Sequence, residues 1–211
     1  MTDDVVAETR ATYDRIAEEY DARNGPPSAE FADWRERALA RLAGQLIADL
    51  GCGPGNHTVD LMRVARVVGL DLSAEMLAIA RRTGAPVVRG DLRRLPFADA
   101  SLDAIWCVAA LLHVPRADVA STLAEWRRVV RPGGLLALST SVGDDEGWEL
   151  VPYDPATGPT SAPLHRWFVH HQPEALVKAL ENAGWSVESV DRRTSHRDWV
   201  MVLARRGVTP T

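Results

Sequence analysis

Hydrophobic residues along the middle of the chain fall into short runs that alternate with segments of helical period. The runs are too short for helices and are bounded by Gly, Pro or Asp, so they predict buried strands. The expected strands are residues 46–50, 66–72, 86–91, 102–108 and 135–140. Apolar residues at three- and four-residue spacing predict amphipathic helices between them. Strands that alternate with single helices indicate crossover units, and therefore a mostly parallel sheet covered on both faces.

The start of the chain predicts two helices and no strand. Within residues 3–22, Tyr13, Ile16 and Tyr20 share one helical face. That face either packs against the rest of the protein or lies over a ligand and offers it Tyr13 or Tyr20. A second helix is expected from about residue 28 to residue 43, so that residues 1–44 form a cap.

The last third of the chain departs from this alternation. Residues 141–168 are rich in Gly, Pro, Asp and Trp without a clear period, which predicts a long loop. Such loops often bind ligands, so we expect residues 141–171 to contact substrate. A helix should follow, and then strands at 185–190 and 199–204. Their connection is too short for a helical crossover, so they should pair in antiparallel fashion.

The elements together predict one α/β domain with a doubly wound sheet of seven strands, mostly parallel with an antiparallel strand near the C-terminus. A chain of 211 residues is long enough for one substantial core. The expected divisions are a cap at 1–44, a cofactor-binding core at 45–140, a substrate loop at 141–171 and a helix with a strand pair at 172–211.

Composition and charge narrow the class of protein. The chain is 46% hydrophobic and 25% charged, as in ordinary globular proteins, and has no apolar run long enough to span a bilayer. A net charge of −5 argues against a dedicated nucleic-acid binder. The acidic start lacks a signal-peptide pattern, and Cys52 and Cys107 are interpreted as reduced, half-buried thiols. We therefore expect a cytoplasmic protein.

A glycine-rich turn lies between the first core strand and its helix. Gly51, Gly53 and Gly55 alternate with Cys52 and Pro54. Glycine permits positive φ and lets the backbone approach a ligand closely. The N–H groups of the turn and of the helix start together favour a negatively charged ligand group.

Asp71 indicates that this ligand contains a ribose. It ends the second strand, 20 residues after Gly51, a separation at which an acidic side chain reaches ribose hydroxyls. The carboxyl ends of the strands should bring Asp71, Asp91 and residues 108–113 to one edge of the sheet. A dinucleotide would favour Gly-x-Gly-x-x-Gly, whereas this turn has Gly-x-Gly-x-Gly, so two kinds of nucleoside cofactor compete.

Further motifs occur in a fixed order over about residues 46–140. They are Asp49 to Gly55, Gly69 to Ser73 with Met76, Gly90 to Leu92, Leu95 to Phe97, Leu102 to Ile105, and Leu123 to Gly134. Their combination resembles the class I S-adenosylmethionine-dependent methyltransferase superfamily in its small single-domain form. The resemblance implies a Rossmann-like fold, methyltransferase activity (EC 2.1.1.-), S-adenosyl-L-methionine as cofactor and S-adenosyl-L-homocysteine as product.

The resemblance also implies a role for each matching residue. The glycine turn would line the methionyl part of the cofactor with Asp49 near its amino group, and Asp71 would hold the ribose. Asp91 would accept from the adenine amino group, while Leu72 and Met76 would sandwich the ring. The implied cofactor contacts are Tyr20, Asp49, Gly51, Cys52, Gly53, Gly55, Asn56, Asp71, Leu72, Met76, Gly90, Asp91, Leu92 and Val108.

Methyl transfer needs an aligned nucleophile and a dry site, and it needs a base only if the acceptor must lose a proton first. His113 follows the fourth strand and is therefore either a general base or a structural histidine. We expect Tyr13, His113, Arg166 and Trp167 around the acceptor and His57 in solvent. No spacing typical of a metal site is present.

The acceptor is expected to be a small organic molecule methylated on O, N or C. Enzymes of this family that methylate amino groups often carry Asn/Asp-Pro-Pro-aromatic after the fourth strand, and Val108 to Leu111 lack it. A monomer or homodimer without nucleic-acid or membrane partners is expected. A nucleotide-linked oxidoreductase and a catalytically silent S-adenosylmethionine-binding protein remain alternatives.

Overall fold

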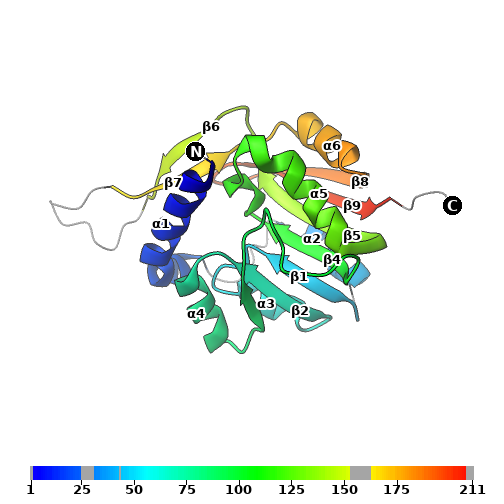
Figure 1. Ribbon diagram of the computed structural model, residues 1–211, viewed down its shortest axis with the longest axis horizontal. Coiled ribbons are helices and arrows are strands. Elements are labelled where there is room, and N and C mark those ends of the chain that lie inside the picture. Colours follow the sequence, from blue (N-terminus) through cyan, green and yellow to red (C-terminus); the bar gives the residue numbers. More distant parts are fainter. Residues whose placement is uncertain (1, 25–30, 43, 153–162, 208–211) are drawn as a thin grey trace.

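A computed structural model of the chain describes residues 2–24, 31–42, 44–152 and 163–207. A seven-stranded sheet lies between two layers of helices, and a long helix crosses one end of its strands (Figure 1). The strands of the sheet are β1 (Leu46–Leu50), β2 (Arg66–Asp71), β3 (Val87–Arg89), β4 (Leu102–Val108), β5 (Val130–Ser141), β8 (Trp185–Thr194) and β9 (Asp198–Arg206).

The strand order β3-β2-β1-β4-β5-β9-β8 confirms the predicted doubly wound sheet. Strands β1 to β5 pair in parallel, whereas β9 is antiparallel to both of its neighbours. The order reverses between β1 and β4, which opens a crevice at their carboxyl ends. The predicted ligand turn follows β1 and therefore lies at this crevice.

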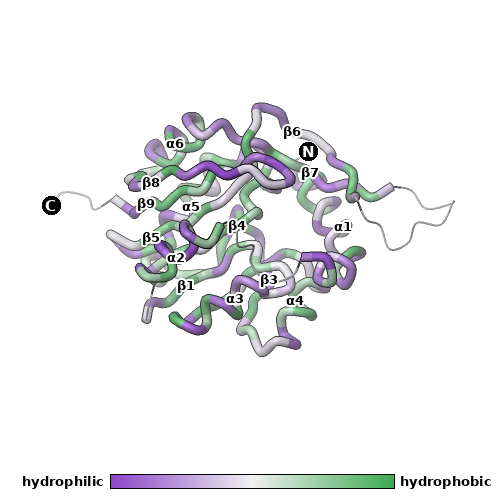
Figure 2. The backbone as a smooth tube through the Cα atoms, turned by 180° about the vertical axis from the view of Figure 1, so that it is seen from behind, coloured by the Kyte–Doolittle hydropathy of each residue, from purple (hydrophilic) through white to green (hydrophobic). Residues whose placement is uncertain are grey.

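The helices bury both faces of the sheet because adjacent strand residues point to opposite sides. Ile47 packs with α2 and α3 residues, whereas its neighbour Ala48 packs with α5 and α6 residues. Figure 2 shows the central strands as hydrophobic and the outer helices as mixed. The helices are α1 (Thr2–Arg23), α2 (Ala32–Leu42), α3 (Asn56–Leu61), α4 (Ala74–Arg82), α5 (Val119–Val129) and α6 (Pro173–Asn182), with 3₁₀ turns η2 (Leu111–His113) and η3 (Arg116–Asp118).

The expected long loop at 141–168 is wrong in part, because it contains two strands. Strand β6 (Glu146–Leu150) pairs with β7 (His165–Val169) as a separate antiparallel sheet. The partners are far apart in sequence, and β7 is held from outside by α1, where the Thr12 hydroxyl donates to the carbonyl of His165 at 2.7 Å. Residues 153–162 of the expected loop and residues 25–30 of the expected cap lie outside the described residues.

Two element boundaries also differ from the prediction, and α3 is short. Helix α3 ends at Leu61, and Met62 beyond it is 42% exposed. Helix α5 ends at Val129, and β5 begins before Pro132, because a residue that precedes proline is pushed towards extended geometry. Strands β8 and β9 absorb most of the polar segment that was expected to connect them.

Candidate functional site

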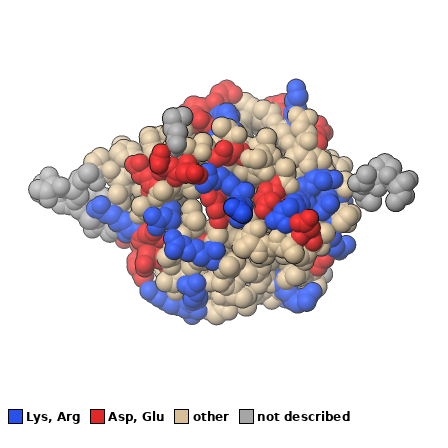
Figure 3. Space-filling view, viewed as in Figure 1, with Lys and Arg blue, Asp and Glu red and all other residues tan. Residues whose placement is uncertain are grey.

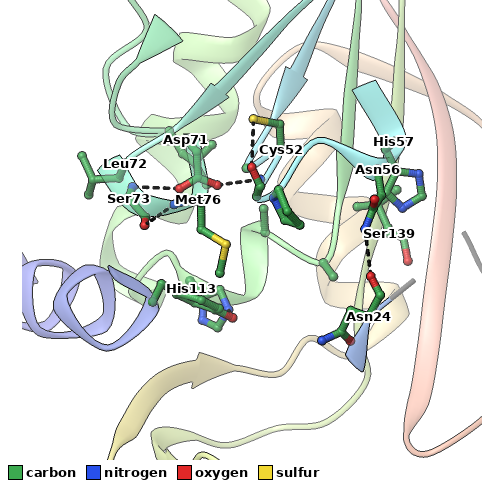
Figure 4. Close-up of a pocket in the computed structure, with 18 of the residues that line it drawn as sticks. Asn24, Cys52, Asn56, His57, Asp71, Leu72, Ser73, Met76, His113 and Ser139 are labelled. Atoms are coloured by element: carbon green, nitrogen blue, oxygen red, sulfur yellow. Dashed lines mark hydrogen bonds between the residues drawn. The ribbon is translucent and has the colours of Figure 1, made fainter. Parts of the chain in front are cut away.

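A cavity of about 460 Å³ opens at the carboxyl ends of β1, β2 and β4. Its walls come from the glycine turn, the ends of β2 and β4, the start of α4, and helices α1 and α2 (Figure 4). This is the edge at which the sequence placed the ligand, and its volume lies in the range of small-molecule sites.

The glycine turn is fixed by close backbone approach on one side and opens to the cavity on the other. Gly51 has φ +71°, and a Cβ there would lie 2.2 Å from the Cβ of Ala110. Gly53 has φ +53° and lines the cavity, and a Cβ there would have no neighbour within 4 Å. A ligand can therefore lie directly on the backbone at Gly53.

Asp71 is held rigidly at the end of β2. One carboxylate oxygen accepts from the Ser73 N–H at 2.8 Å, and the other accepts from the Gly53 N–H at 2.9 Å (Figure 4). Burial raises the pKa of the Asp71 carboxyl, whereas these N–H groups oppose that shift. The carboxylate thus links the glycine turn to the start of α4 and lines the cavity, as expected for a ribose contact.

Asp49 lies beneath the turn and is not among the residues that line the cavity. It is 2% exposed and accepts from the Thr58 hydroxyl at 2.6 Å. Burial raises its pKa to about 7 despite that hydrogen bond. The structure therefore shows Asp49 joining β1 to α3, one layer behind the position predicted for it.

Asp91 lines the cavity together with Leu92, but an arginine that the sequence did not single out already engages its carboxylate. The Arg93 guanidinium donates to both Asp91 oxygens, at 2.8–3.2 Å, and also to Asp118 at 3.0 Å. Arg93 also pairs with Asp3 of α1 at 2.8 Å. The first turn of α1 is thereby ion-paired to the part of the cavity where the adenine is predicted to bind.

The start of α4 forms another wall. The Ser73 hydroxyl accepts from the Met76 N–H and so caps the start of the helix. Leu72 and Met76 both line the cavity, and Met76 packs with Ala17 and Tyr20 of α1. Of the other predicted cofactor contacts, Cys52, Asn56 and Val108 line the cavity, whereas Gly55 and Gly90 do not.

His113 is half-buried and lies in a directed network of hydrogen bonds. Its Nδ1 lies 2.6 Å from the Trp167 carbonyl, which can only accept, so Nδ1 carries the proton. Nε2 therefore accepts from the Tyr13 hydroxyl at 2.7 Å, and the Tyr13 oxygen accepts from Arg166 at 3.2 Å. Burial, together with the charges of Arg166 and Arg197, lowers the pKa of His113 to about 3, while the hydrogen bond to the Trp167 carbonyl opposes the shift.

The predicted acceptor residues separate into two groups. Tyr13 and His113 line the cavity, whereas Arg166 and Trp167 are not among its lining residues. Both lie on β7 and support the residues that do line it. The Arg166 guanidinium donates to the Tyr13 hydroxyl, and the Trp167 carbonyl accepts from His113. The sequence analysis missed this arrangement because it predicted a loop at 141–168 and not the strand that positions Arg166 and Trp167.

An aromatic wall closes the end of the cavity beneath α2. We define it as Phe31, Trp34, His57, Trp106 and Trp199, all of which line the cavity. The Trp106 ring lies 5.2 Å from that of Trp34 and 5.7 Å from that of His57. The expectation that His57 faces solvent is wrong, because its half-buried side chain lines the cavity beside Trp106; burial lowers its pKa to about 4. Trp106 could have been found from the sequence, because it lies two strand residues before Val108.

Cys52 and Cys107 are free and buried, at 7% and 0% exposure, and not half-buried as expected. Burial raises the pKa of the Cys52 thiol far above its ordinary value and that of Cys107 to about 12. Neither thiol is a ready nucleophile, because the thiolate is the reactive form.

Metal-ligating clusters and membrane-spanning helices are both absent from the described residues. Residues 2–24, 31–42, 44–152 and 163–207 contain no group of three or more His, Cys, Asp or Glu side chains placed to hold a metal ion. No helix in that part of the chain has the length and apolarity needed to cross a bilayer.

The fold and this cavity define a class I S-adenosylmethionine-dependent methyltransferase, and comparison with known proteins supports that class. A family described as "Methyltransferase domain" matches residues 48–138. The chain is 33% identical over 187 residues to a demethylmenaquinone methyltransferase of Mycobacterium sp. (strain KMS), covering 86% of this chain and 72% of the relative. The chain belongs to this methyltransferase family.

Two further relatives extend the comparison. A trans-aconitate 2-methyltransferase of Azoarcus sp. (strain BH72) is 41% identical over 129 residues, covering 56% of this chain and 50% of the relative. The solved structure titled "DhpI-SAH complex structure" matches with a TM-score of 0.76 and 25% identity, covering 98% of this chain and 99% of that one. These similarities favour methyl transfer over the alternative of a nucleotide-linked oxidoreductase.

Proposed function

We propose that the chain binds S-adenosylmethionine along the cavity and transfers its methyl group to a small organic acceptor. The ribose would lie against Asp71, the adenine between Leu72 and Met76 near Asp91, and the methionyl part on the glycine turn. The observation that carries this proposal is Asp71, a half-buried carboxylate held by two backbone N–H groups at the rim of a cavity.

The residues present fit this cofactor. Gly53 leaves its backbone open to the cavity, and Asp71 offers carboxylate oxygens to hydroxyl donors. The bound cofactor supplies a methyl group on a positively charged sulfur. The protein's own contribution is to align the acceptor and to exclude water, for which α1 and the aromatic wall are suited.

His113 is better placed to position Tyr13 than to remove a proton. Its free lone pair already accepts from Tyr13, and its pKa of about 3 makes it a very weak base at neutral pH. We therefore assign His113 and Tyr13 to the cavity wall on the α1 side, with Arg166 and Trp167 supporting them.

The names of the relatives indicate the size of the molecules that they methylate. One relative acts on demethylmenaquinone and another on trans-aconitate, and a solved complex is titled "DhpI-SAM-HEP complex". These names support a small-molecule acceptor for this chain. We further propose a cytoplasmic monomer or homodimer with residues 1–44 as cap, 45–140 as cofactor core, 141–171 at the substrate and 172–211 completing one domain.

Nucleic acid is not proposed as a partner. Acidic and basic side chains are interspersed over the face shown in Figure 3, and the chain has a net charge of −5. A nucleic-acid surface would present a continuous basic patch.

A matched pair of glycine substitutions tests the cofactor site. Gly53 and Gly44 both have positive φ and open space where a Cβ would be, but of the two only Gly53 lines the cavity. Gly53→Ala should weaken S-adenosylhomocysteine binding by about tenfold or more, because its methyl group takes up ligand space. Gly44→Ala carries similar backbone strain and should leave binding unchanged.

The measurement is calorimetry on both variants, followed by assay of S-adenosylhomocysteine release with demethylmenaquinone and trans-aconitate as trial acceptors. Equal losses of affinity in the two variants would mean that strain, and not the cavity, explains the effect. Failure of the unaltered protein to bind S-adenosylhomocysteine would contradict the proposed function.

A further inference from the structure

We infer that the methyl acceptor is the anion of a small oxygen acid, which reacts in its ionised form while N–H groups of the aromatic wall and Arg35 hold its oxygens. This inference rests on the proposed function and adds the chemical class of the acceptor. Two independent features of the cavity support it. The groups that could take a proton are already hydrogen-bonded within the protein, and several N–H donors near α2 have no hydrogen-bond partner.

The first feature is that the described lining residues provide no proton acceptor ready for a substrate proton. The Nε2 lone pair of His113 accepts from Tyr13, and protonation would place a cation among Arg166 of β7, Arg197 of the β8–β9 turn and the Phe168 ring. Both oxygens of Asp71 accept backbone N–H groups, and Asp91 is bound by Arg93.

His57 is no better placed to act as a base. It faces Trp106 of β4, Arg35 of α2 and Asp60 of its own helix. Burial lowers its pKa to about 4; Asp60 opposes this shift and Arg35 adds to it. The cavity therefore offers no ready base to a methyl acceptor that must lose a proton before it reacts. An aliphatic amine is such an acceptor, because it is protonated at neutral pH. A carboxylic or phosphonic acid arrives already ionised.

The second feature is a group of unpaired nitrogen atoms. Four buried nitrogens of lining residues have no hydrogen-bond partner: Nε1 of Trp34, Nε1 of Trp106, Nε of Arg35 and Nδ1 of His57. The first three can only donate. A buried donor left unsatisfied costs about 1–3 kcal/mol, so such a group is expected to have a partner in the working state.

Only an acceptor atom complements these donors. Carboxylate or phosphonate oxygens accept several N–H groups at once, whereas an amine or amide N–H would meet donor against donor. Arg35 adds a further donor, since Asp60 engages its Nη1 at 3.0 Å and leaves its Nε unpaired. The rings of Phe31 and Trp199, 6.0 Å apart, leave apolar surface for the carbon skeleton of the acid.

The topology separates this end from the predicted nucleoside end. Asp91 and Asp71 follow β3 and β2, on one side of the β1–β4 switch point. Trp106 and Trp199 lie on β4 and β9, on the other side. The aromatic wall therefore lies away from the place predicted for the adenosine.

The test uses protein saturated with S-adenosylhomocysteine and labelled with ¹⁵N at its seven tryptophans. Benzoate, trans-aconitate and ethylphosphonate are titrated against benzamide and benzyl alcohol as neutral probes. We expect the indole N–H signals of Trp34 and Trp106, assigned with Trp34→Phe and Trp106→Phe, to shift more with at least one acid than with either neutral probe, because an ionised oxygen accepts more strongly than a neutral one.

Turnover with the bound acid then tests the ionised form. With S-adenosylmethionine and a carboxylic acid as acceptor, kcat should change by less than about twofold between about pH 6 and about pH 8, since neither the acceptor nor a histidine must lose a proton in that range. Arg35→Gln should raise KM for the acid about tenfold and leave the dissociation constant of S-adenosylhomocysteine unchanged. Arg37→Gln is the matched control, because Arg37 lies on the same helix and pairs with Asp191 at the surface.

Four results would overturn the inference. They are methylation of neutral acceptors alone, a kcat that rises with a midpoint near neutral pH, a loss of S-adenosylhomocysteine affinity in Arg35→Gln, and the absence of binding by every acid. A loss of S-adenosylhomocysteine affinity in Arg35→Gln would mean that these donors bind the carboxylate of the cofactor and not the acceptor. In each of these cases the unaltered protein would still bind S-adenosylhomocysteine. The proposed function would be contradicted only if that binding were absent.

Discussion

At the scale of single residues, Asp49 and Asp71 show how position beside a turn divides structural from ligand-facing carboxylates. Asp71 ends β2 and lines the cavity, whereas Asp49 lies within β1 and accepts from Thr58 beneath the turn. In the register, Asp49 lies opposite Gly69, two residues before Asp71, so both carboxylates point to the same face and only Asp71 reaches the carboxyl edge of the sheet. Asp49 therefore contributes to stability in a way that depends on pH.

Asp49→Asn tests that contribution. The folded protein holds the Asp49 proton up to about pH 7, whereas the unfolded chain releases it near its ordinary pKa of about 3.9. The folded state binds more protons in this window, so this residue's contribution to stability falls as pH rises, by up to about 1.4 kcal/mol per pH unit. Asn cannot titrate and should remove that slope.

Urea unfolding of both proteins between about pH 4 and about pH 8 gives the comparison. The difference between them isolates Asp49, because His57 and His113 have lowered pKa values and act in the opposite direction in both proteins. Parallel stability curves would show that Asp49 does not carry the raised pKa.

The residues recovered from the sequence are those whose role depends on local spacing. Gly51, Gly53 and Asp71 are fixed by a strand, a turn and a count of positions, all visible in one segment. Arg93 and Trp34 could not be found this way, because their roles depend on Asp118 and Trp106, which lie far along the chain.

At the scale of elements, α1 acts as a wall that bridges two parts of the cavity rim. Asp14 accepts from the Ser73 hydroxyl at 2.7 Å, and the Thr9 hydroxyl accepts from the Trp167 N–H at 3.0 Å. Ser73 also donates its N–H to Asp71. The helix is thereby coupled to the carboxylate predicted to hold the ribose.

Asp14→Ala should loosen this coupling. The partly buried hydrogen bond to Ser73 is lost, and we expect S-adenosylhomocysteine to bind about three- to tenfold more weakly, with faster amide exchange in α1. Glu18→Gln on the same helix is the control, since its ion pair with Arg82 is exposed and contributes little. Equal affinities for Asp14→Ala and the unaltered protein, measured by calorimetry, would show that α1 docks independently of the site.

The elements were predicted best where the pattern is local. Strand β4 (Leu102–Val108) matches its expected range. Strands β6 and β7 were missed because each is stabilised by a partner distant in sequence, and neither carries a strong alternating pattern.

At the scale of the whole molecule, the strand order brings the predicted site together. Asp91, Asp71, the glycine turn and Val108 follow β3, β2, β1 and β4, which are neighbours in the sheet. The sequence predicted a doubly wound sheet from alternating strands and helices. It could not predict how α1 and β7 enclose the cavity, because those contacts are tertiary and have no periodic signal.

The central claim is that this cavity binds an S-adenosyl cofactor through Asp71. The most direct measurement is calorimetric titration of the unaltered protein, Asp71→Asn and the exposed control Asp33→Asn with S-adenosylhomocysteine and with NAD. We predict that S-adenosylhomocysteine binds the unaltered protein and Asp33→Asn alike, at least about tenfold more tightly than it binds Asp71→Asn, and that NAD gives no comparable binding. Tight binding of NAD, or an unchanged affinity of Asp71→Asn for S-adenosylhomocysteine, would contradict the account.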